Sequence, residues 1–388
     1  HESGKKMDSI KDKVNHIGDE ALLTAKKIVI KVGSSLLIEE KYGSIRKQWF
    51  ASFISDVVNL KKKNKKIIIV SSGAINLGRK ILNLRDRSLT LEEKQAAASV
   101  GQIELAKEYQ QHFKKNKLIS SQVLMTLDDT TNRRRYLNCR STLNTLINLG
   151  VVPIVNENDT VATDEIRYGD NDRLAAQVAS ICDCDLLVLL SDIDGFYTKS
   201  PKKHKDAEHI PLITEITKDL ELMAEDAESE YSNGGMKTKL EAGKIAISVG
   251  CNMVITSGLR NNPIGEMNSR NSTWFMASNS VKVARKKWIL NMKSTGEIEI
   301  DENAKKALQE GNSLLPVGTI SCQGSFNRGD VVIIKSKDNN VLAKGLVSYN
   351  HLETEQIIGL KSADIAKTLG YNGRSVLVHR DDMAFYKE

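Results

Sequence analysis

Two lysines are the residues of this sequence whose types and positions most clearly point to chemistry. Lys31 lies in the apolar run Lys27–Val32, where a positive charge is costly unless it meets an anion. Lys239 follows residues 233–238, a glycine-containing loop at the start of a helical pattern. Backbone amides of such a loop can wrap phosphate groups. A lone Lys239 would be interpreted as an exposed helix lysine, but the loop before it favours a phosphate contact.

Four turns rich in small, polar or glycine residues follow four apolar, β-branched segments. They are Lys31–Ser35, Ser71–Ile75, Asn156–Asp159 and Ser191–Gly195. Ligands of an open parallel sheet bind beyond the carboxyl ends of its strands, so these turns should meet at one edge. Glycine lets backbone N–H groups approach an anion, and a following helix adds its positive end. One such turn is ordinary in a βα connection, whereas four predict a phosphate-binding edge.

The segment Gly169-Asp170-Asn171-Asp172 places two carboxylates just before a helical pattern. One of them is accounted for as a helix N-cap, a position that Asp and Asn favour. The other could be held near two lysines and fix their positions while they face a phosphate. Phosphoryl transfer depends on alignment and on positive charge at the transferred group more than on covalent help. The segment therefore favours a phosphotransferase.

These residues need a scaffold, and apolar β-branched runs alternating with amphipathic stretches predict one. The alternation is typical of a mainly parallel open sheet with helices on both faces, an α/β three-layer αβα sandwich. We expect strands at 27–32, 67–70, 118–124, 151–155, 185–190 and 252–256, and helices at 46–63, 91–113, 132–149, 171–181 and 236–249.

A chain of 388 residues exceeds what one hydrophobic core usually organises, so two domains are expected. The first is predicted at 27–278. The polar segment Ala277–Arg285 is predicted to be a linker, and 286–388 a small, mainly β domain. Residues 1–26 are interpreted as an N-terminal extension that begins with a tag remnant and stands outside the fold.

Composition limits the classes of protein further. The net charge of +7 fits an anionic substrate and also weak nucleic-acid contact. The five cysteines are odd in number and lack zinc spacing, which favours reduced thiols and predicts no metal site. No run approaches the roughly 20 apolar residues that cross a bilayer, so a cytoplasmic protein is expected. The sequence also lacks the P-loop pattern, protein-kinase motifs and the G-x-S-x-G motif.

On these residues the chain resembles the amino acid kinase family, and within it the glutamate kinases. The most specific segment is Asn156–Thr163, continued by Gly169–Asp172, with further agreement at Ile67–Gly78 and Gly234–Lys239. The C-terminal region resembles a PUA domain, through Gly311–Gly318 and Phe326–Asp330.

The resemblance implies roles for individual residues. Lys31 and Lys239 would be catalytic cations that contact the ATP phosphates, and Asp172 would orient both. The implied glutamate-binding residues are Ser72, Gly73, Asn156, Asp159, Asp170 and Asn171. The implied ATP-binding residues are Lys31, Gly33, Ser191, Asp192, Asn233, Gly234, Gly235, Met236, Lys237, Thr238 and Lys239.

It also implies ATP and Mg²⁺ as cofactors, with the Mg²⁺ arriving on ATP. The expected reaction is phosphorylation of the L-glutamate γ-carboxylate, the first step of proline biosynthesis, with feedback inhibition by proline. Expected partners are a second copy of the chain, in a dimer or tetramer, and a reductase that receives γ-glutamyl phosphate. No membrane partner is expected.

Two alternatives stay open. A related kinase acting on acetylglutamate, aspartate, carbamate or a nucleotide would share the lysines and the glycine turns. An RNA-binding accessory protein would share the PUA-like region and the basic charge, although its basic residues are not obviously interleaved with aromatics. RNA binding is therefore not expected as the main function. The run Arg133–Arg135 could contact RNA or phosphate, but its place at a helix start favours a structural or interface role.

Overall fold

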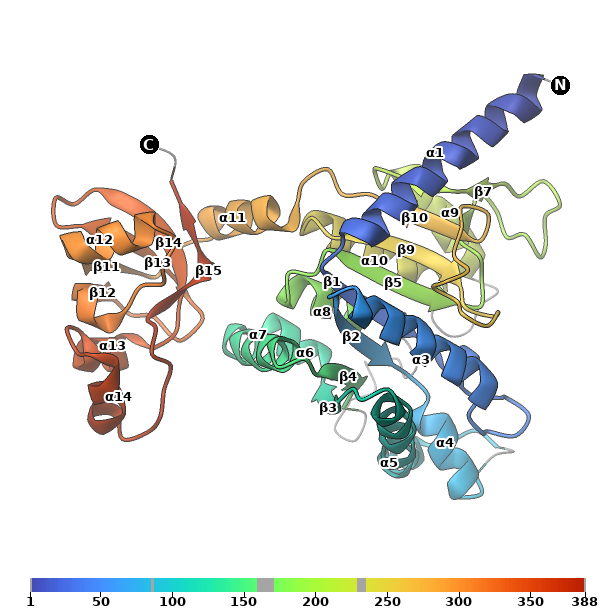
Figure 1. Cartoon of the computed structure of the whole chain (residues 1–388), viewed down its shortest axis with the longest axis horizontal. Helices are drawn as coiled ribbons and strands as arrows, with labels where there is room; N and C mark the ends of the chain where they lie inside the picture. The colour runs from blue at the N-terminus through green and yellow to red at the C-terminus, as the bar shows by residue number, and fades with distance from the viewer. Residues whose placement is uncertain (1, 85–86, 159–170, 229–234, 387–388) are drawn as a thin grey trace. The chain divides into compact units, whose positions relative to one another are not determined.

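The computed structural model of the chain describes residues 2–84, 87–158, 171–228 and 235–386. The chain divides into two compact units (Figure 1). The first unit contains His1–Thr130 and Cys139–Val281, and the second contains Thr131–Asn138 and Lys282–Glu388.

The first unit is organised around an open sheet of eight strands in the order β3-β4-β2-β1-β5-β9-β10-β8. Neighbouring strands run parallel, except that β10 is antiparallel to β9. The strands are β1 (Lys27–Val32), β2 (Lys66–Ser71), β3 (Ser120–Met125), β4 (Val152–Glu157), β5 (Leu186–Ser191), β8 (Leu212–Ile213), β9 (Asn252–Ser257) and β10 (Ser272–Phe275). A separate ribbon pairs β6 (Phe196–Tyr197) with β7 (His209–Ile210).

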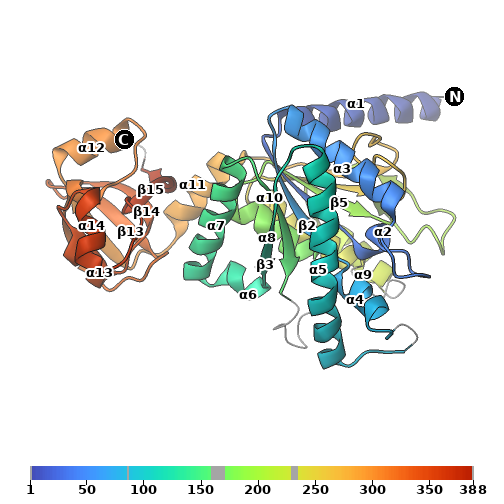
Figure 2. The same cartoon turned by 60° about the horizontal axis from the view of Figure 1, so that its bottom comes forward.

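Helices cover both faces of this sheet, as the two views show (Figures 1 and 2). They are α1 (Glu2–Thr24), α2 (Ser34–Leu37), α3 (Lys47–Lys62), α4 (Ala74–Ile81), α5 (Leu91–Lys115), α6 (Leu127–Thr131), α8 (Asp172–Ile181), α9 (Lys218–Glu228) and α10 (Met236–Ser248), with α7 (Arg133–Asn148) starting in the second unit. The predicted three-layer α/β fold is confirmed, and the predicted strands and helices match the observed ones to within two residues at each end.

Strand β1 shows how the layers are separated. Successive side chains of a strand point to opposite faces. Ile28, Ile30 and Val32 belong to the same buried cluster as Phe50 of α3. Lys31 therefore points to the other face, where α8 packs against β1 and β5. The sheet thus delivers one charged residue of an apolar strand to the layer formed by α8 and α10.

The N-terminal segment departs from the prediction. The extension predicted at residues 1–26 was expected to stand outside the fold, yet α1 covers most of it, and Val14, Ala21 and Ala25 are buried in the main core cluster. The side chain of Asn15 accepts a hydrogen bond from the backbone N–H of Ser269, at 2.7 Å. The polar composition misled the prediction, because a narrow apolar stripe is enough to seat a helix on a core.

Two glycines allow α4 and α5 to cross closely. A Cβ atom on Gly78 would lie 1.7 Å from the backbone oxygen of Ala97, and one on Gly101 would lie 1.7 Å from that of Ala74. No side chain fits at either position. Gly78, the last residue of the family-like segment Ile67–Gly78, therefore has a packing role.

The second unit contains a five-stranded sheet in the order β12-β11-β13-β14-β15. Its strands are β11 (Gly296–Ile300), β12 (Thr319–Gly324), β13 (Val331–Ser336), β14 (Val341–Val347) and β15 (Val378–Phe385), and its helices are α11 (Val281–Asn291), α12 (Glu302–Gln309), η1 (Pro316–Gly318), α13 (His351–Ile357) and α14 (Ser362–Leu369). The expected linker Ala277–Arg285 is only partly a linker, because α11 begins at Val281.

No helix in the described part of the chain is long and apolar enough to cross a membrane.

Candidate active site

The two predicted lysines meet at one buried carboxylate. Lys31 Nζ lies 3.0 Å from Asp172 Oδ1, and Lys239 Nζ lies 3.1 Å from Asp172 Oδ2. The side chains of both lysines are 8% exposed and that of Asp172 is 1% exposed. Three charges removed from water in this way are stable only because they compensate one another. The arrangement leaves one net positive charge beside the sheet edge.

The charge state of Asp172 follows from its surroundings. Burial acts to raise the pKa of its carboxyl group. The charges of Lys239 and Lys31, together with their hydrogen bonds, outweigh that effect and hold the pKa well below its ordinary value. Asp172 is therefore ionised at neutral pH. Thr238 adds a hydrogen bond from its hydroxyl group to Asp172 Oδ2, at 3.2 Å.

Three elements bring these side chains together. Lys31 lies near the carboxyl end of the central strand β1, Asp172 is the first residue of α8, and Lys239 lies in the first turn of α10. The positive ends of two helices thus lie at the carboxylate, which suits an anionic group. Lys31, Asp172 and Lys239 are far apart in the sequence, but they meet because α8 and α10 pack side by side on β1, β5 and β9.

The residues assigned to glutamate gather partly around the end of β2. Asn171 donates from Nδ2 to the backbone oxygen of Ser71 at 3.2 Å and to Ser72 Oγ at 3.0 Å. Gly73 has φ of +112°, a left-handed conformation that favours glycine, and it turns the chain from β2 into α4. Asn156, at the end of the neighbouring strand β4, is buried at 6% exposure. These four assigned residues thus lie at the carboxyl ends of adjacent strands or beside them.

The residues assigned to ATP lie on the other side of Lys31. Gly33 directly follows β1, and a Cβ atom placed on it would lie 3.6 Å from Lys31 Nζ. Ser191 ends β5 and accepts a hydrogen bond at Oγ from the backbone N–H of Ile193, at 3.3 Å, next to Asp192. The start of α10 supplies the remaining described members, which are Gly235, Met236, Lys237, Thr238 and Lys239.

Four predicted site residues lie outside the residues that the structure describes. They are Asp159 and Asp170 of the glutamate set and Asn233 and Gly234 of the ATP set. Their assignments stay predictions.

Helix α5 supports this edge in a way that was not predicted from the sequence. Tyr109 donates from its hydroxyl group to Ser71 Oγ at 2.8 Å, and Gln102 donates from Nε2 to the backbone oxygen of Glu157 at 3.4 Å. Both side chains are buried. Burial raises the pKa of Tyr109 above its ordinary value and outweighs the hydrogen bond to Ser71, which acts to lower it, so the phenol stays protonated. The sequence did contain a signal for this support: Gln102 and Tyr109 are two helical turns apart, so their polar ends lie on the same, otherwise apolar face of α5.

Among the described residues, no group of three or more His, Cys, Asp or Glu side chains is arranged to hold a metal ion.

Comparison with known proteins identifies the families of the two parts of the chain. Residues 26–257 match the model of the amino acid kinase family, and residues 296–369 match that of the PUA domain. The chain therefore belongs to the amino acid kinase family and carries a PUA domain after the kinase domain.

The relatives narrow the class. A glutamate 5-kinase of Ruegeria sp. is 51% identical over 365 residues, which cover 94% of this chain and 99% of the relative. A glutamate 5-kinase of Bartonella henselae is 52% identical over 369 residues, covering 95% and 97%. Within the amino acid kinase family the chain thus groups with the glutamate 5-kinases, which are phosphotransferases with a carboxyl group as acceptor.

Proposed function

We propose that this chain transfers the γ-phosphoryl group of ATP to the γ-carboxylate of L-glutamate, giving γ-glutamyl phosphate and ADP. The observation that carries the proposal is the single buried Asp172, which holds both Lys31 and Lys239 at the edge where the glycine turns meet. The glutamate 5-kinase relatives support the choice of acceptor.

The mechanism follows from the charges. An oxygen of the glutamate γ-carboxylate attacks the γ-phosphorus, a phosphorus–oxygen bond forms, and the bond to the β-phosphate oxygen breaks. The electron pair of that bond leaves with ADP. A carboxylate is already ionised at pH 7, so no general base is needed. The ammonium groups of Lys31 and Lys239 stabilise the charge that is spread over the transferred phosphoryl oxygens.

Asp172 is a positioning residue in this scheme. Each of its two oxygens holds one lysine, so the two ammonium groups keep a fixed separation from each other. Fixed donors stabilise the transition state more than mobile ones, because no reorganisation is needed when the charge moves. Mg²⁺ enters as part of the ATP substrate, bound through phosphate and water oxygens.

Ser72, Gly73, Asn156 and Asn171 are proposed to hold glutamate, together with Asp159 and Asp170. Asp159 is the proposed partner of the α-ammonium group. Gly33, Ser191, Asp192 and residues 233–239 are proposed to line the ATP site. The described members of the two sets lie around Lys31 and Asp172, which supports this division.

The reaction is tested by measuring ADP release with ATP, Mg²⁺ and each of glutamate, N-acetylglutamate, aspartate and carbamate. Hydroxylamine in the assay traps an acyl phosphate as its hydroxamate. ADP and hydroxamate formed with glutamate alone are the expected result. Turnover with another acceptor would keep the kinase and overturn the substrate, and no turnover with any of the four would overturn the proposal.

The physiological setting is proposed from the family resemblance alone. The product would enter proline biosynthesis through a reductase acting on γ-glutamyl phosphate, in the cytoplasm, and the enzyme would be a dimer or tetramer. Proline is proposed to compete at the glutamate site as a feedback inhibitor. Turnover at low glutamate should fall when millimolar proline is added, and an unchanged rate would contradict this.

A further inference from the structure

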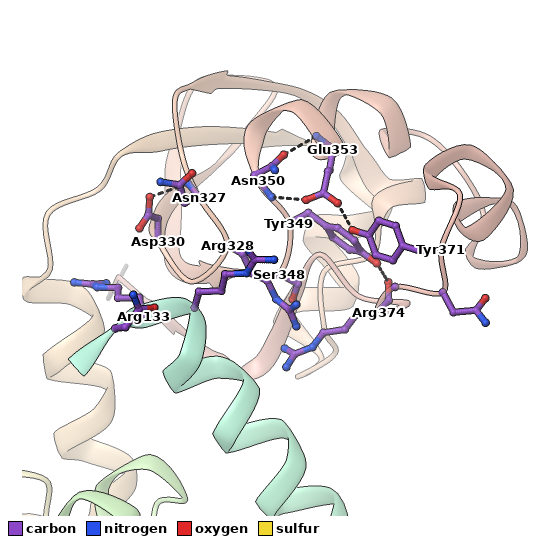
Figure 3. A pocket seen from close by; sticks show the side chains of 14 residues that line it. Arg133, Asn327, Arg328, Asp330, Ser348, Tyr349, Asn350, Glu353, Tyr371 and Arg374 are labelled. Carbon is purple, nitrogen blue, oxygen red and sulfur yellow. Dashed lines mark hydrogen bonds between the residues drawn. The ribbon is translucent and has the colours of Figure 1, made fainter. Parts of the chain in front are cut away.

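The second unit contains a polar pocket of about 710 Å³ that phosphotransfer does not use. Its lining comes from four separate stretches of chain, at 132–134, 327–330, 348–353 and 371–374 (Figure 3). All of these stretches belong to the second unit. The volume falls within the range of about 300–1,000 Å³ that is usual for small-molecule sites.

Arginine is the residue type that distinguishes the lining. Arg133, Arg134, Arg328 and Arg374 all contribute to it. Figure 3 shows Arg133, Arg328 and Arg374 among the side chains that line the pocket, with Tyr349 next to Arg374. A guanidinium group is charged at every accessible pH and presents a planar fork of donors, which matches a phosphate group. Four such groups in one pocket predict an anionic occupant.

The four arginines outnumber the two carboxylates of the lining, Asp330 and Glu353, so the lining keeps an excess of positive charge. Asp330 accepts a hydrogen bond at Oδ2 from the backbone N–H of Asn327, at 2.8 Å, which closes the turn before β13. Glu353 forms a capping box with Asn350 at the start of α13 and also accepts the hydroxyl hydrogen of Tyr371. Both acidic groups therefore hold the protein's own backbone and side chains in place.

Arg328 has an unmet hydrogen-bonding requirement. Its Nε atom is buried and has no hydrogen-bond partner among the described residues. The salt bridges found in the described part of the chain do not include Arg133, Arg134 or Arg328. Leaving a buried donor of a charged group unsatisfied is costly. A bound oxyanion would remove that cost.

The walls of the pocket are packed against each other and are therefore largely preformed. Gly329 has φ of +91°, and a Cβ atom on it would lie 2.9 Å from the backbone oxygen of Arg133. Leu137 of α7 packs with Val331 and Leu346. Arg374 donates from Nη2 to the backbone oxygen of Leu137, at 3.4 Å. The first turns of α7, which carry Arg133 and Arg134, are thus fixed to the sheet of the second unit.

We propose that this pocket binds a phosphorylated small molecule, with Arg328 and Arg133 as its principal phosphate ligands. The run Arg133–Arg135, for which the sequence favoured a structural role, then has a second role through its first two members. The hydroxyl-bearing Tyr349 and Tyr371 and the asparagines of the lining suit a ligand that carries a ribose or base beside its phosphate. The pocket is separate from the proposed ATP site, because it shares no residue with it.

The test is isothermal titration calorimetry of the full chain with pyrophosphate and with guanosine monophosphate. Guanosine monophosphate is chosen because it lacks the adenine that the proposed ATP site would bind. Arg328→Gln and Arg133→Gln should each weaken binding about tenfold or more, the effect of losing a hydrogen bond to a charged group. Arg133 is exposed, so its variant tests the site even if Arg328→Gln does not fold. Arg380→Gln, an exposed arginine of the same unit outside the lining, is the matched control and should leave affinity unchanged.

A second control separates this site from the kinase site. Lys239→Met should remove phosphate contacts at the proposed active site but leave titration of the pocket intact. Loss of binding in Lys239→Met with retention in both arginine variants would overturn the proposal. So would the absence of binding by either probe, or binding of single-stranded RNA only, which would make the pocket part of a nucleic-acid surface.

Discussion

In the first unit two buried lysines share one buried carboxylate, whereas in the second unit three of the four arginines that line a pocket form no salt bridge with the described residues. In the first arrangement each lysine has a carboxylate oxygen as its partner, so the three side chains are held in position although one net positive charge remains. The second has an unsatisfied donor, Arg328 Nε, and two well-exposed members, Arg133 and Arg134. The two proposals therefore assign two different uses to positive charge: in the first unit it aligns a transferred group, and in the second it binds an anionic ligand.

The largest effect should come from removing the carboxylate that completes the first arrangement. Asp172→Asn leaves Lys31 and Lys239 buried without a counter-charge, which should lower unfolding free energy by about 3 kcal/mol. Turnover should fall by about 10³-fold, because both ammonium groups lose their fixed positions. Urea unfolding and ADP release measure the two effects.

Asp206→Asn is the matched control. Asp206 pairs with Lys199 at 2.6 Å, but both side chains are well exposed. Exposed pairs contribute no more than about 1 kcal/mol, so this variant should behave like the parent chain. Equal losses for the two substitutions would contradict the view that burial gives the Asp172 network its importance.

A smaller effect is expected when one cation is removed. Lys239→Met keeps the volume of the side chain and should lower kcat by about 10²-fold, the usual consequence of losing one transition-state donor. Lys244 lies on the same helix, is well exposed and pairs with Glu221, so Lys244→Met should keep full activity. A folded Lys239→Met variant with unchanged kcat would show that its role is assigned wrongly.

In each unit a glycine allows two stretches of backbone to approach closely, and the effect of adding a Cβ atom can be compared between the two glycines. Gly101→Ala would push a Cβ atom to 1.7 Å from the backbone of Ala74, so it should cost about 3 kcal/mol of stability. Gly329→Ala meets Arg133 at 2.9 Å and has a positive φ, so about 2 kcal/mol is expected. The first variant should reduce turnover and the second pyrophosphate affinity. A reversed pattern would undo the separation of the two sites.

The smallest effect is expected for the dependence of unfolding free energy on acidic pH. The pKa of Asp172 is lower in the folded chain than in the unfolded one, so its stabilising contribution is complete above the ordinary carboxyl pKa of about 4. That contribution is lost as pH falls from there through the folded-state value. The difference in unfolding free energy between the parent chain and Asp172→Asn should therefore be constant from neutral to mildly acidic pH and should shrink below pH 4. A difference that grows in acid would contradict the ionised carboxylate.

Much of the first unit was predictable because its signals are local. Apolar, β-branched runs such as Leu186–Leu190 predicted the strands, and their alternation with helices predicted a mainly parallel sheet. The carboxyl ends of parallel strands share one edge, which brought Lys31, Ser72 and Asn156 together in the prediction. The short strands β8 and β10 were not predicted, because two to four residues are too few to show a strand periodicity.

The sequence by itself indicated the kind of chemistry, because two lysines, a pair of carboxylates and four glycine or polar turns at strand ends occur together, although each of them alone has an ordinary structural use. Tertiary structure alone decided which groups share a hydrogen bond. The sequence did not show that Tyr109 supports Ser71, that α1 enters the core, or that Arg133 and Arg328 line one pocket. The physical reason is that such contacts join residues far apart in the chain, and packing of whole helices and sheets, rather than any local pattern, sets their distance.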